Sequence, residues 1–148
     1  MKKSTRKILL VLCTIGCLGF IWINSVMPGR VSGELSGYAE KIIKIIFGDG
    51  FALSEAVIRK LAHAFEFAVF GVILSLLFYE KLASRLPLVG FLGLGSAVFD
   101  ETIQLFSDGR SSQIKDVWID FSGFTAGTLL IFILYVFDKS TKGKHGRL

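Results

Sequence analysis

The sequence predicts an all-α membrane protein with four transmembrane helices, and three observations support this fold class. The chain has 148 residues, of which 52% are hydrophobic before its 16 glycines are counted, whereas soluble domains reach about 45–50% with glycine included. Only 20% of the residues are charged, too few to cover a water-soluble globule. The apolar residues form four runs, each about 20 residues long, the length that crosses a hydrocarbon core of about 30 Å.

The net charge of +5 is concentrated at the two ends of the chain. The basic residues that flank the first and last apolar runs are Lys2, Lys3, Arg6, Lys7, Lys139, Lys142, Lys144 and Arg147. Basic residues in such positions are typical of membrane proteins. We therefore expect the lipid bilayer as a partner and no nucleic acid.

The first predicted span covers residues 8–27 and is ended by Pro28 and Gly29. Its basic start and apolar middle also suit a cleaved signal peptide. However, it lacks a clean small-x-small cleavage site and its apolar part is long, which favours an uncleaved anchor. Cys13 and Cys17 lie four residues apart on one face of this helix, and joining them would break helical geometry, so we expect no disulfide.

The segment that follows contains a predicted amphipathic helix, placed either on the outer membrane face or against the bundle. Its polar side carries Glu40, Lys41 and Lys44, and the sequence 48–50 (Gly-Asp-Gly) is expected to end it. Its apolar side is predicted from residues at helical spacing, namely Leu35, Tyr38, Ala39, Ile42, Ile45 and Ile46.

The other three spans are predicted at residues 61–79, 87–106 and 117–137. Ser54 and Glu55 suit the first turn of a helix, as cap and as partner of the helix dipole. This helix is expected to continue into the second span. Gly123 and Gly127 lie four residues apart in the last span and should let a neighbouring helix approach closely.

The distribution of basic residues predicts that both chain termini lie inside the cell. Ten of the 17 lysines and arginines lie in the N-terminal stub, the link between the second and third spans, and the C-terminal tail, against seven elsewhere. By the positive-inside rule this bias indicates an N-in, C-in topology. Residues 29–60 and 107–116 would then be outside.

Charged residues enter the outer parts of the spans, where they are costly. Residues 86–99 are free of charge and span only about 21 Å of helix, so the acids after them should lie in the outer part of the bilayer or its interface. Intramembrane acids usually turn inward and mark function. The expected ligand-binding residues come from three spans and one loop: Arg59, Lys60, His63, Glu66, Asp100, Glu101, Gln104, Arg110, Asp116 and Asp120.

Simpler interpretations exist for several of these residues. Arg59 and Lys60 could extend their charges to the interface at a helix start. Asp116 could stabilise the N-terminus of the last span through the helix dipole. Arg110 could pair with an acid and close the bundle without doing chemistry.

Four motifs follow one another at compatible spacing between residues 55 and 135. They are Arg59-Lys60-Leu61-Ala62-His63-Ala64-Phe65-Glu66-Phe67, Asp100-Glu101-Thr102-Ile103-Gln104-Leu105-Phe106, Gly109-Arg110-Ser111, and Lys115-Asp116-Val117 with Asp120, Gly123 and Gly127. Together they resemble the VanZ-like family of small polytopic bacterial membrane proteins. The chain departs from the family pattern at Phe67, where tyrosine is usual, at Asp120, where asparagine is common, and at Asp108, where proline often stands.

The resemblance implies a multi-pass protein of the bacterial cytoplasmic membrane and cell envelope. The family is named for a protein that gives low-level resistance to the glycopeptide teicoplanin. We therefore expect that binding of a ligand by this chain affects glycopeptide susceptibility.

Three hypotheses follow for the function. In the favoured one, the outer polar cluster binds an envelope lipid, a lipid-linked precursor or a lipidated or glycopeptide molecule, and Arg59, Lys60 and Arg110 hold its phosphate or carboxylate groups. In the second, the protein is a membrane-embedded hydrolase or transferase that acts on a lipid-linked phosphate. In the third, the charges form structural ion pairs only.

The candidate catalytic residues for the second hypothesis are His63, Glu66 and Glu101, with His63 as general base and Glu66 as its orienting partner. The favoured hypothesis needs no cofactor. A divalent metal is an alternative, because Glu101, Asp116 and Asp120 offer the carboxylate oxygens that Mg²⁺ and Ca²⁺ prefer.

Overall fold

A computed structural model of the chain describes residues 2–47, 53–110 and 113–145, without the side chains of residues 35, 36, 39, 43, 47 and 143–145. The helices in this part are α1 (Lys3–Val26), α2 (Gly29–Phe47), α3 (Glu55–Leu77), the short 3₁₀ helix η1 (Tyr79–Lys81), α4 (Leu82–Gln104) and α5 (Ile114–His145). The described residues contain no strand, in agreement with the predicted all-α class. The expectations for residues 48–50, for Ser111 and Arg147, and for the side chains of Leu35, Ala39 and Lys144 lie outside the described part.

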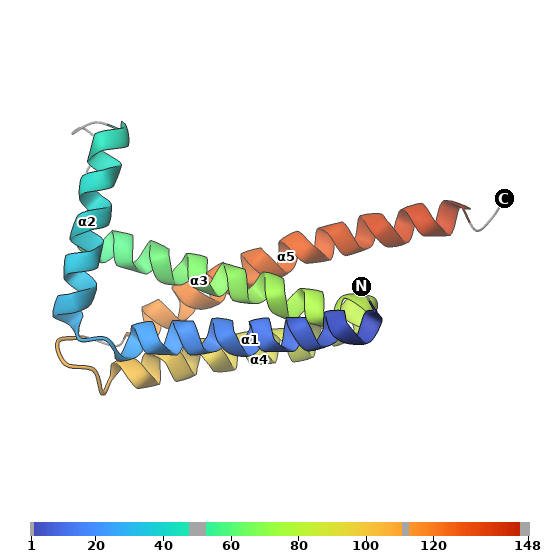
Figure 1. Cartoon of the computed structure of the whole chain (residues 1–148), viewed down its shortest axis with the longest axis horizontal. Coiled ribbons are helices and arrows are strands. Elements are labelled where there is room, and N and C mark those ends of the chain that lie inside the picture. The colour runs from blue at the N-terminus through green and yellow to red at the C-terminus, as the bar shows by residue number, and fades with distance from the viewer. Residues whose placement is uncertain (1, 48–52, 111–112, 146–148) are drawn as a thin grey trace.

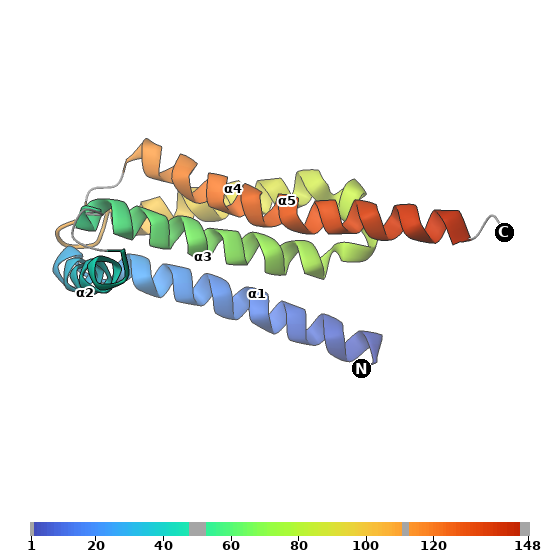
Figure 2. The ribbon, with the colours of Figure 1, turned by 90° about the horizontal axis from the view of Figure 1, so that it is seen from above.

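The four long helices run roughly along one axis, and α2 lies across one end of them (Figure 1). Seen from above, α3 lies between α1 and α5 (Figure 2). We call the end at which α1 and α4 end and α3 and α5 begin the polar end. Both chain termini lie at the opposite end (Figure 1).

Within the described part of the chain, four helical segments are long and apolar enough to cross a membrane: Lys3–Val26, Glu55–Leu77, Tyr79–Gln104 and Ile114–Lys142. At most 33% of the most apolar stretch of each is buried inside the structure. Large side chains such as Ile15, Phe65 and Phe91 therefore face outward. A soluble protein does not expose so much apolar surface to water. Lipid tails can cover this surface, so the helices belong to a membrane protein, as the sequence predicted.

The close approach of α3 and α5 depends on small residues, as the sequence predicted. A Cβ atom added to Gly123 would collide with the carbonyl oxygen of Ala64, and one added to Gly127 would collide with that of Ala68. The two backbones therefore touch where side chains would otherwise separate them. Next to this contact lies the aromatic core, in which the Phe70 and Phe124 rings are 5.4 Å apart.

The start of α3 is the predicted one, whereas α4 begins earlier than expected. The Ser54 side chain accepts a hydrogen bond from the backbone N–H of Val57 at 3.4 Å, so it caps α3. The third span was expected to begin at Pro87, but α4 begins at Leu82 and carries Pro87 inside it. Proline at this place removes one hydrogen bond of the second turn, a loss that the start of a helix tolerates better than its middle.

Helix α2 leaves much of its predicted apolar side uncovered. Tyr38, Ile42, Ile45 and Ile46 are all more than half exposed. On the other side, Lys44 forms an ion pair with Glu40 at 2.6 Å. The N-terminus of α2 is held at the polar end, where the backbone N–H of Gly29 donates to the carbonyl of Asp108 at 2.9 Å.

Candidate functional site

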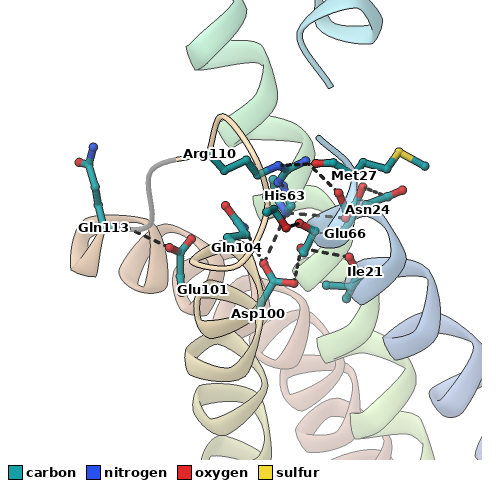
Figure 3. A network of polar contacts seen from close by, with 12 residues as sticks. Ile21, Asn24, Met27, His63, Glu66, Asp100, Glu101, Gln104, Arg110 and Gln113 are labelled. Carbon is teal, nitrogen blue, oxygen red and sulfur yellow. Dashed lines mark hydrogen bonds and ion pairs between the residues drawn. The ribbon is translucent and has the colours of Figure 1, made fainter. Parts of the chain in front are cut away.

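The polar residues predicted from the sequence gather at the polar end of the bundle, and Figure 3 shows His63, Glu66, Asp100, Glu101, Gln104 and Arg110 among them. Helices α3, α4 and α5 and the α4–α5 loop contribute the expected groups. The last turn of α1 contributes Asn24 and Ser25 as well. The C-terminal ends of α1 and α4 therefore meet the N-terminal ends of α3 and α5 in one cluster.

Asp100 is the central acceptor of this cluster and is completely buried. One carboxylate oxygen accepts a hydrogen bond from the Ser25 hydroxyl at 2.5 Å, and the other accepts one from the Gln104 amide at 2.8 Å. The Nδ1 atom of His63 lies 4.0 Å from the second oxygen. Asp100 therefore joins α1 to α4 by a hydrogen bond, and His63 of α3 lies close to it without one.

The expected pair of His63 and Glu66 is close but not hydrogen-bonded. His63 Nδ1 lies 3.9 Å from Glu66 Oε2, which is beyond hydrogen-bond distance. Instead, Glu66 Oε1 accepts from the Asn24 amide at 2.9 Å. His63 Nδ1 and Glu66 Oε2 are both buried, and neither has a hydrogen-bond partner among the described residues. A general base oriented by Glu66 is therefore not assembled in this structure.

Arg110 fastens the α4–α5 loop to the end of α1. Its guanidinium donates to the backbone oxygens of Met27 at 3.0 Å and Asn24 at 2.8 Å, and it lies 3.5 Å from His63 Nε2 (Figure 3). These carbonyls end a helix, where a positive charge is stabilising. Arg110 forms no ion pair with an acid in the described part of the chain. Burial lowers its pKa, and the nearby charge of Arg59 lowers that pKa further.

Two further contacts join α5 and its preceding loop to the other helices. Lys60 on α3 forms an ion pair with Asp116, which lies in the first turn of α5. The backbone N–H of Gln113 donates to Glu101 Oε2 at 3.1 Å (Figure 3). The Lys60–Asp116 pair is the kind of contact that the structural hypothesis requires.

A cavity of about 310 Å³ opens at the polar end between α3, α4, α5 and the α4–α5 loop. Of the ten expected ligand-binding residues, those that line it are Arg59, Lys60, His63, Glu101, Gln104, Arg110, Asp116 and Asp120. Glu66 and Asp100 are not among its lining residues and bond instead to Asn24 and Ser25 of α1. We call this cavity the polar pocket.

Three buried carboxylates lie together beside the polar pocket. The side chains of Asp100, Glu101 and Asp120 each offer an oxygen within 4.8 Å of the others. The sequence suggested Asp116 in place of Asp100, but Asp116 pairs with Lys60. The positions of the acids along their two helices do not reveal which acids of one helix face those of the other.

The sequence interpretation missed the contribution of α1. Asn24 and Ser25 are adjacent polar residues at the end of the mostly apolar first span, and this pair is the sequence signal for the contribution of α1. The sequence interpretation also missed Ser107. Its hydroxyl donates a hydrogen bond to the backbone oxygen of Ser25 at 2.8 Å. Through these residues, α1 contacts the cluster of polar side chains that the motifs on α3 and α4 contribute.

A second hollow, of about 520 Å³, lies at the opposite end of the bundle. Its walls include apolar residues of α1 and α3, and its basic residues are Lys3, Arg6, Lys7, Lys81 and Arg85. Basic side chains above apolar walls suit the anionic headgroups of ordinary membrane lipids. We call this hollow the basic groove.

Comparison with known proteins identifies the family of the chain. No curated protein and no solved structure matches the sequence. The sequence model of the VanZ/LLP1 family matches residues 9–135. The match extends beyond the expected range of 55–135 and includes most of α1, with Asn24 and Ser25. Because it covers most of the sequence, this membrane protein belongs to the VanZ/LLP1 family.

Proposed function

We propose that the protein binds the phosphate-bearing headgroup of a lipid-linked envelope molecule in the polar pocket. The observation that carries this proposal is the set of three basic side chains, Arg59, Lys60 and Arg110, on the wall of a cavity at the end of the membrane-spanning helices. A headgroup attached to a lipid reaches such a cavity while its tail stays in the bilayer.

The three basic side chains differ in how far they are already engaged. Arg110 donates to backbone oxygens of α1, and Lys60 is paired with Asp116. Arg59 has no hydrogen bond or ion pair within the described residues, and its charge acts on Arg110. An anion between the two guanidiniums would relieve their repulsion and accept charge-assisted hydrogen bonds from both. Arg59 is therefore the main proposed ligand contact.

The size of the pocket favours a headgroup over a whole antibiotic. About 310 Å³ lies at the lower end of the range for small-molecule sites, about 300–1,000 Å³. A glycopeptide of teicoplanin type is much larger than this cavity. We therefore expect any effect on glycopeptide susceptibility to be indirect, through the lipid-linked molecule that the protein retains.

We also infer that the polar end faces the outside of the bacterial cytoplasmic membrane. Both termini lie at the other end (Figure 1), which also carries the basic groove. The positive-inside rule places such an end in the cytoplasm. On this topology, α2 lies outside, with its exposed apolar side chains available to the membrane interface.

This topology predicts which end of the protein a protease can reach in intact cells that have no outer membrane. A protease site appended after Leu148 should remain uncut until the cells are lysed, because the C-terminus lies in the cytoplasm. Immunoblotting for a tag beyond the site measures the cleavage. If the site were cut in intact cells while a cytoplasmic marker protein stayed uncut, the C-terminus would lie outside and the proposed topology would be wrong.

Replacing Arg59 with alanine tests the proposed binding directly. A charge-assisted hydrogen bond contributes about 1.5–3 kcal/mol, so Arg59→Ala should weaken binding of a prenyl phosphate about 10- to 100-fold. The dissociation constant can be measured with purified protein in nanodiscs. Lys115→Ala is the matched control, because Lys115 is exposed at the same end and does not line the pocket. Equal affinities of wild type and Arg59→Ala would refute the role of Arg59.

A membrane-embedded hydrolase or transferase is the second candidate, because His63 and the carboxylates of Glu101 and Asp120 line the same pocket. Binding without turnover is favoured over it, since Glu66 bonds to Asn24 and does not orient the histidine. Release of phosphate or of a cleaved lipid by the wild type, lost in His63→Ala, would favour the enzyme instead.

A further inference from the structure

The three carboxylates of Asp100, Glu101 and Asp120 are buried more deeply than unassisted charges should be. Their exposed fractions are 0%, 4% and 2%, and their oxygens lie within 4.8 Å of one another. Removing a carboxylate from water is costly unless a partner compensates it. Like charges at this spacing add to the cost. Some compensation must therefore come from the surroundings.

The protein supplies part of this compensation. Asp100 accepts hydrogen bonds from Ser25 and Gln104, and Glu101 accepts one from the backbone N–H of Gln113. Asp120 differs, because its buried oxygen Oδ2 has no hydrogen-bond partner among the described residues. Such an unpartnered buried oxygen calls for an explanation, and a group bound beside the three carboxylates would supply the missing partner.

The nearby basic side chains do not supply it. Lys60 pairs with Asp116, and Arg110 donates to the backbone oxygens at the end of α1. His63 approaches Asp100 at 4.0 Å, through Nδ1. In the described part of the chain, no ion pair reaches Asp120.

We propose that Asp100, Glu101 and Asp120 bind a divalent cation of the Ca²⁺ or Mg²⁺ class. Carboxylate oxygens are the ligands that these hard cations prefer, and no cysteine takes part in the cluster. Glu101 and Asp120 also line the polar pocket, so water can complete the coordination sphere. The cation would join α4 to α5 in a place where their own side chains repel each other.

Ca²⁺ accepts a wider and less regular arrangement of oxygen ligands than Mg²⁺ does. Two oxygens bound to one Ca²⁺ at about 2.3–2.6 Å can be at most about 5.2 Å apart, whereas for Mg²⁺ at about 2.0–2.1 Å the limit is about 4.2 Å. All three oxygens lie within 4.8 Å of one another, so their separations satisfy the Ca²⁺ limit whatever their individual values. Calcium is therefore the first ion to test, and Mg²⁺ and Mn²⁺ follow.

The experiment measures metal binding by the full-length protein without any lipid phosphate, so its outcome does not depend on the proposed ligand. Protein purified in a maltoside detergent is stripped with a chelator and titrated with CaCl₂. We expect a saturable rise in thermal stability, since a ligand that binds the folded state stabilises it. Electron paramagnetic resonance of added Mn²⁺ should show one bound ion per chain, displaced by Ca²⁺.

The matched variants are Asp120→Ala and Asp108→Ala, which remove the same charge at the same end of the bundle. Asp108 is exposed and lies outside the carboxylate cluster. Asp120→Ala should weaken Ca²⁺ binding by more than about 10- to 100-fold, the usual cost of losing even a supporting contact. Asp108→Ala should bind Ca²⁺ like the wild type.

Two results would overturn the metal site. The wild type alone would refute it if none of the three cations changed its thermal stability and no Mn²⁺ were bound, a readout that does not require any variant to fold. Wild-type affinity in Asp120→Ala would also refute it. If Asp120→Ala were instead more stable than the wild type, and added metals did not change the thermal stability of the wild type, the Asp120 carboxyl group would be neutral and would need no cation.

Discussion

Replacing Gly127 with alanine is expected to destabilise the protein, although alanine is the better helix former. The added Cβ would collide with the backbone oxygen of Ala68 on α3. A backbone atom cannot rotate away as a flexible side chain can, so α3 and α5 must separate. Overpacking of this kind costs about 1–3 kcal/mol, and each kcal/mol lowers the melting temperature of a domain of this size by about 2–4 °C.

The melting temperature of purified protein in detergent measures this effect, and Gly95→Ala provides the matched control. Gly95 lies in α4 with no atom near the position of an added Cβ. Its replacement should leave stability unchanged or raise it by about 0.5–1 kcal/mol through helix propensity. If both variants behaved alike, the close contact between α3 and α5 would not contribute to stability.

Replacing Arg110 with alanine is the second change with a large expected effect. It removes the donors to the backbone oxygens of Asn24 and Met27 and leaves the loop attached to α1 by weaker contacts. Losing hydrogen bonds from a charged group costs about 1.5–3 kcal/mol. We expect faster amide hydrogen exchange at the end of α1 and the start of α2, where Gly29 donates to Asp108.

Arg110→Lys separates the charge of this residue from its geometry. Lysine keeps the positive charge but lacks the planar fork that reaches two carbonyls at once, so exchange should still be faster than in the wild type. Arg85→Ala, at the opposite end of the bundle, should leave these amides unchanged. Wild-type exchange in Arg110→Lys would indicate that charge alone holds the loop.

The spans could be predicted from the sequence because they depend on length and composition. Four apolar runs of sufficient length have few alternatives to crossing the bilayer, and the described residues form four helices that satisfy this requirement. The glycine contact was predictable for a similar reason, since Gly123 and Gly127 repeat at helical spacing.

The partners of individual charges could not be predicted in the same way. Whether Asp116 faces Lys60 or the other acids depends on the register of α5 against α3, which single-helix periodicity does not fix. The structure pairs Asp116 with Lys60 and places Asp100 beside Asp120. In the same way, Glu66 bonds to Asn24 and leaves His63 without a hydrogen bond to Glu66, because the end of α1 packs against α3, a contact that the periodicity of either helix alone does not reveal.

The measurement that tests the central proposal most directly is photo-crosslinking of a prenyl phosphate with a photoreactive group next to its phosphate. The protein is crosslinked in nanodiscs and the modified peptides are identified by mass spectrometry. We predict adducts in the segments 56–63, 109–110 and 113–120, which contain most of the residues that line the polar pocket. These adducts should decrease in Arg59→Ala and persist in Lys115→Ala. Adducts confined to residues 3–11 and 76–85, at the basic groove, would place the lipid phosphate at the wrong end of the bundle and contradict the proposal.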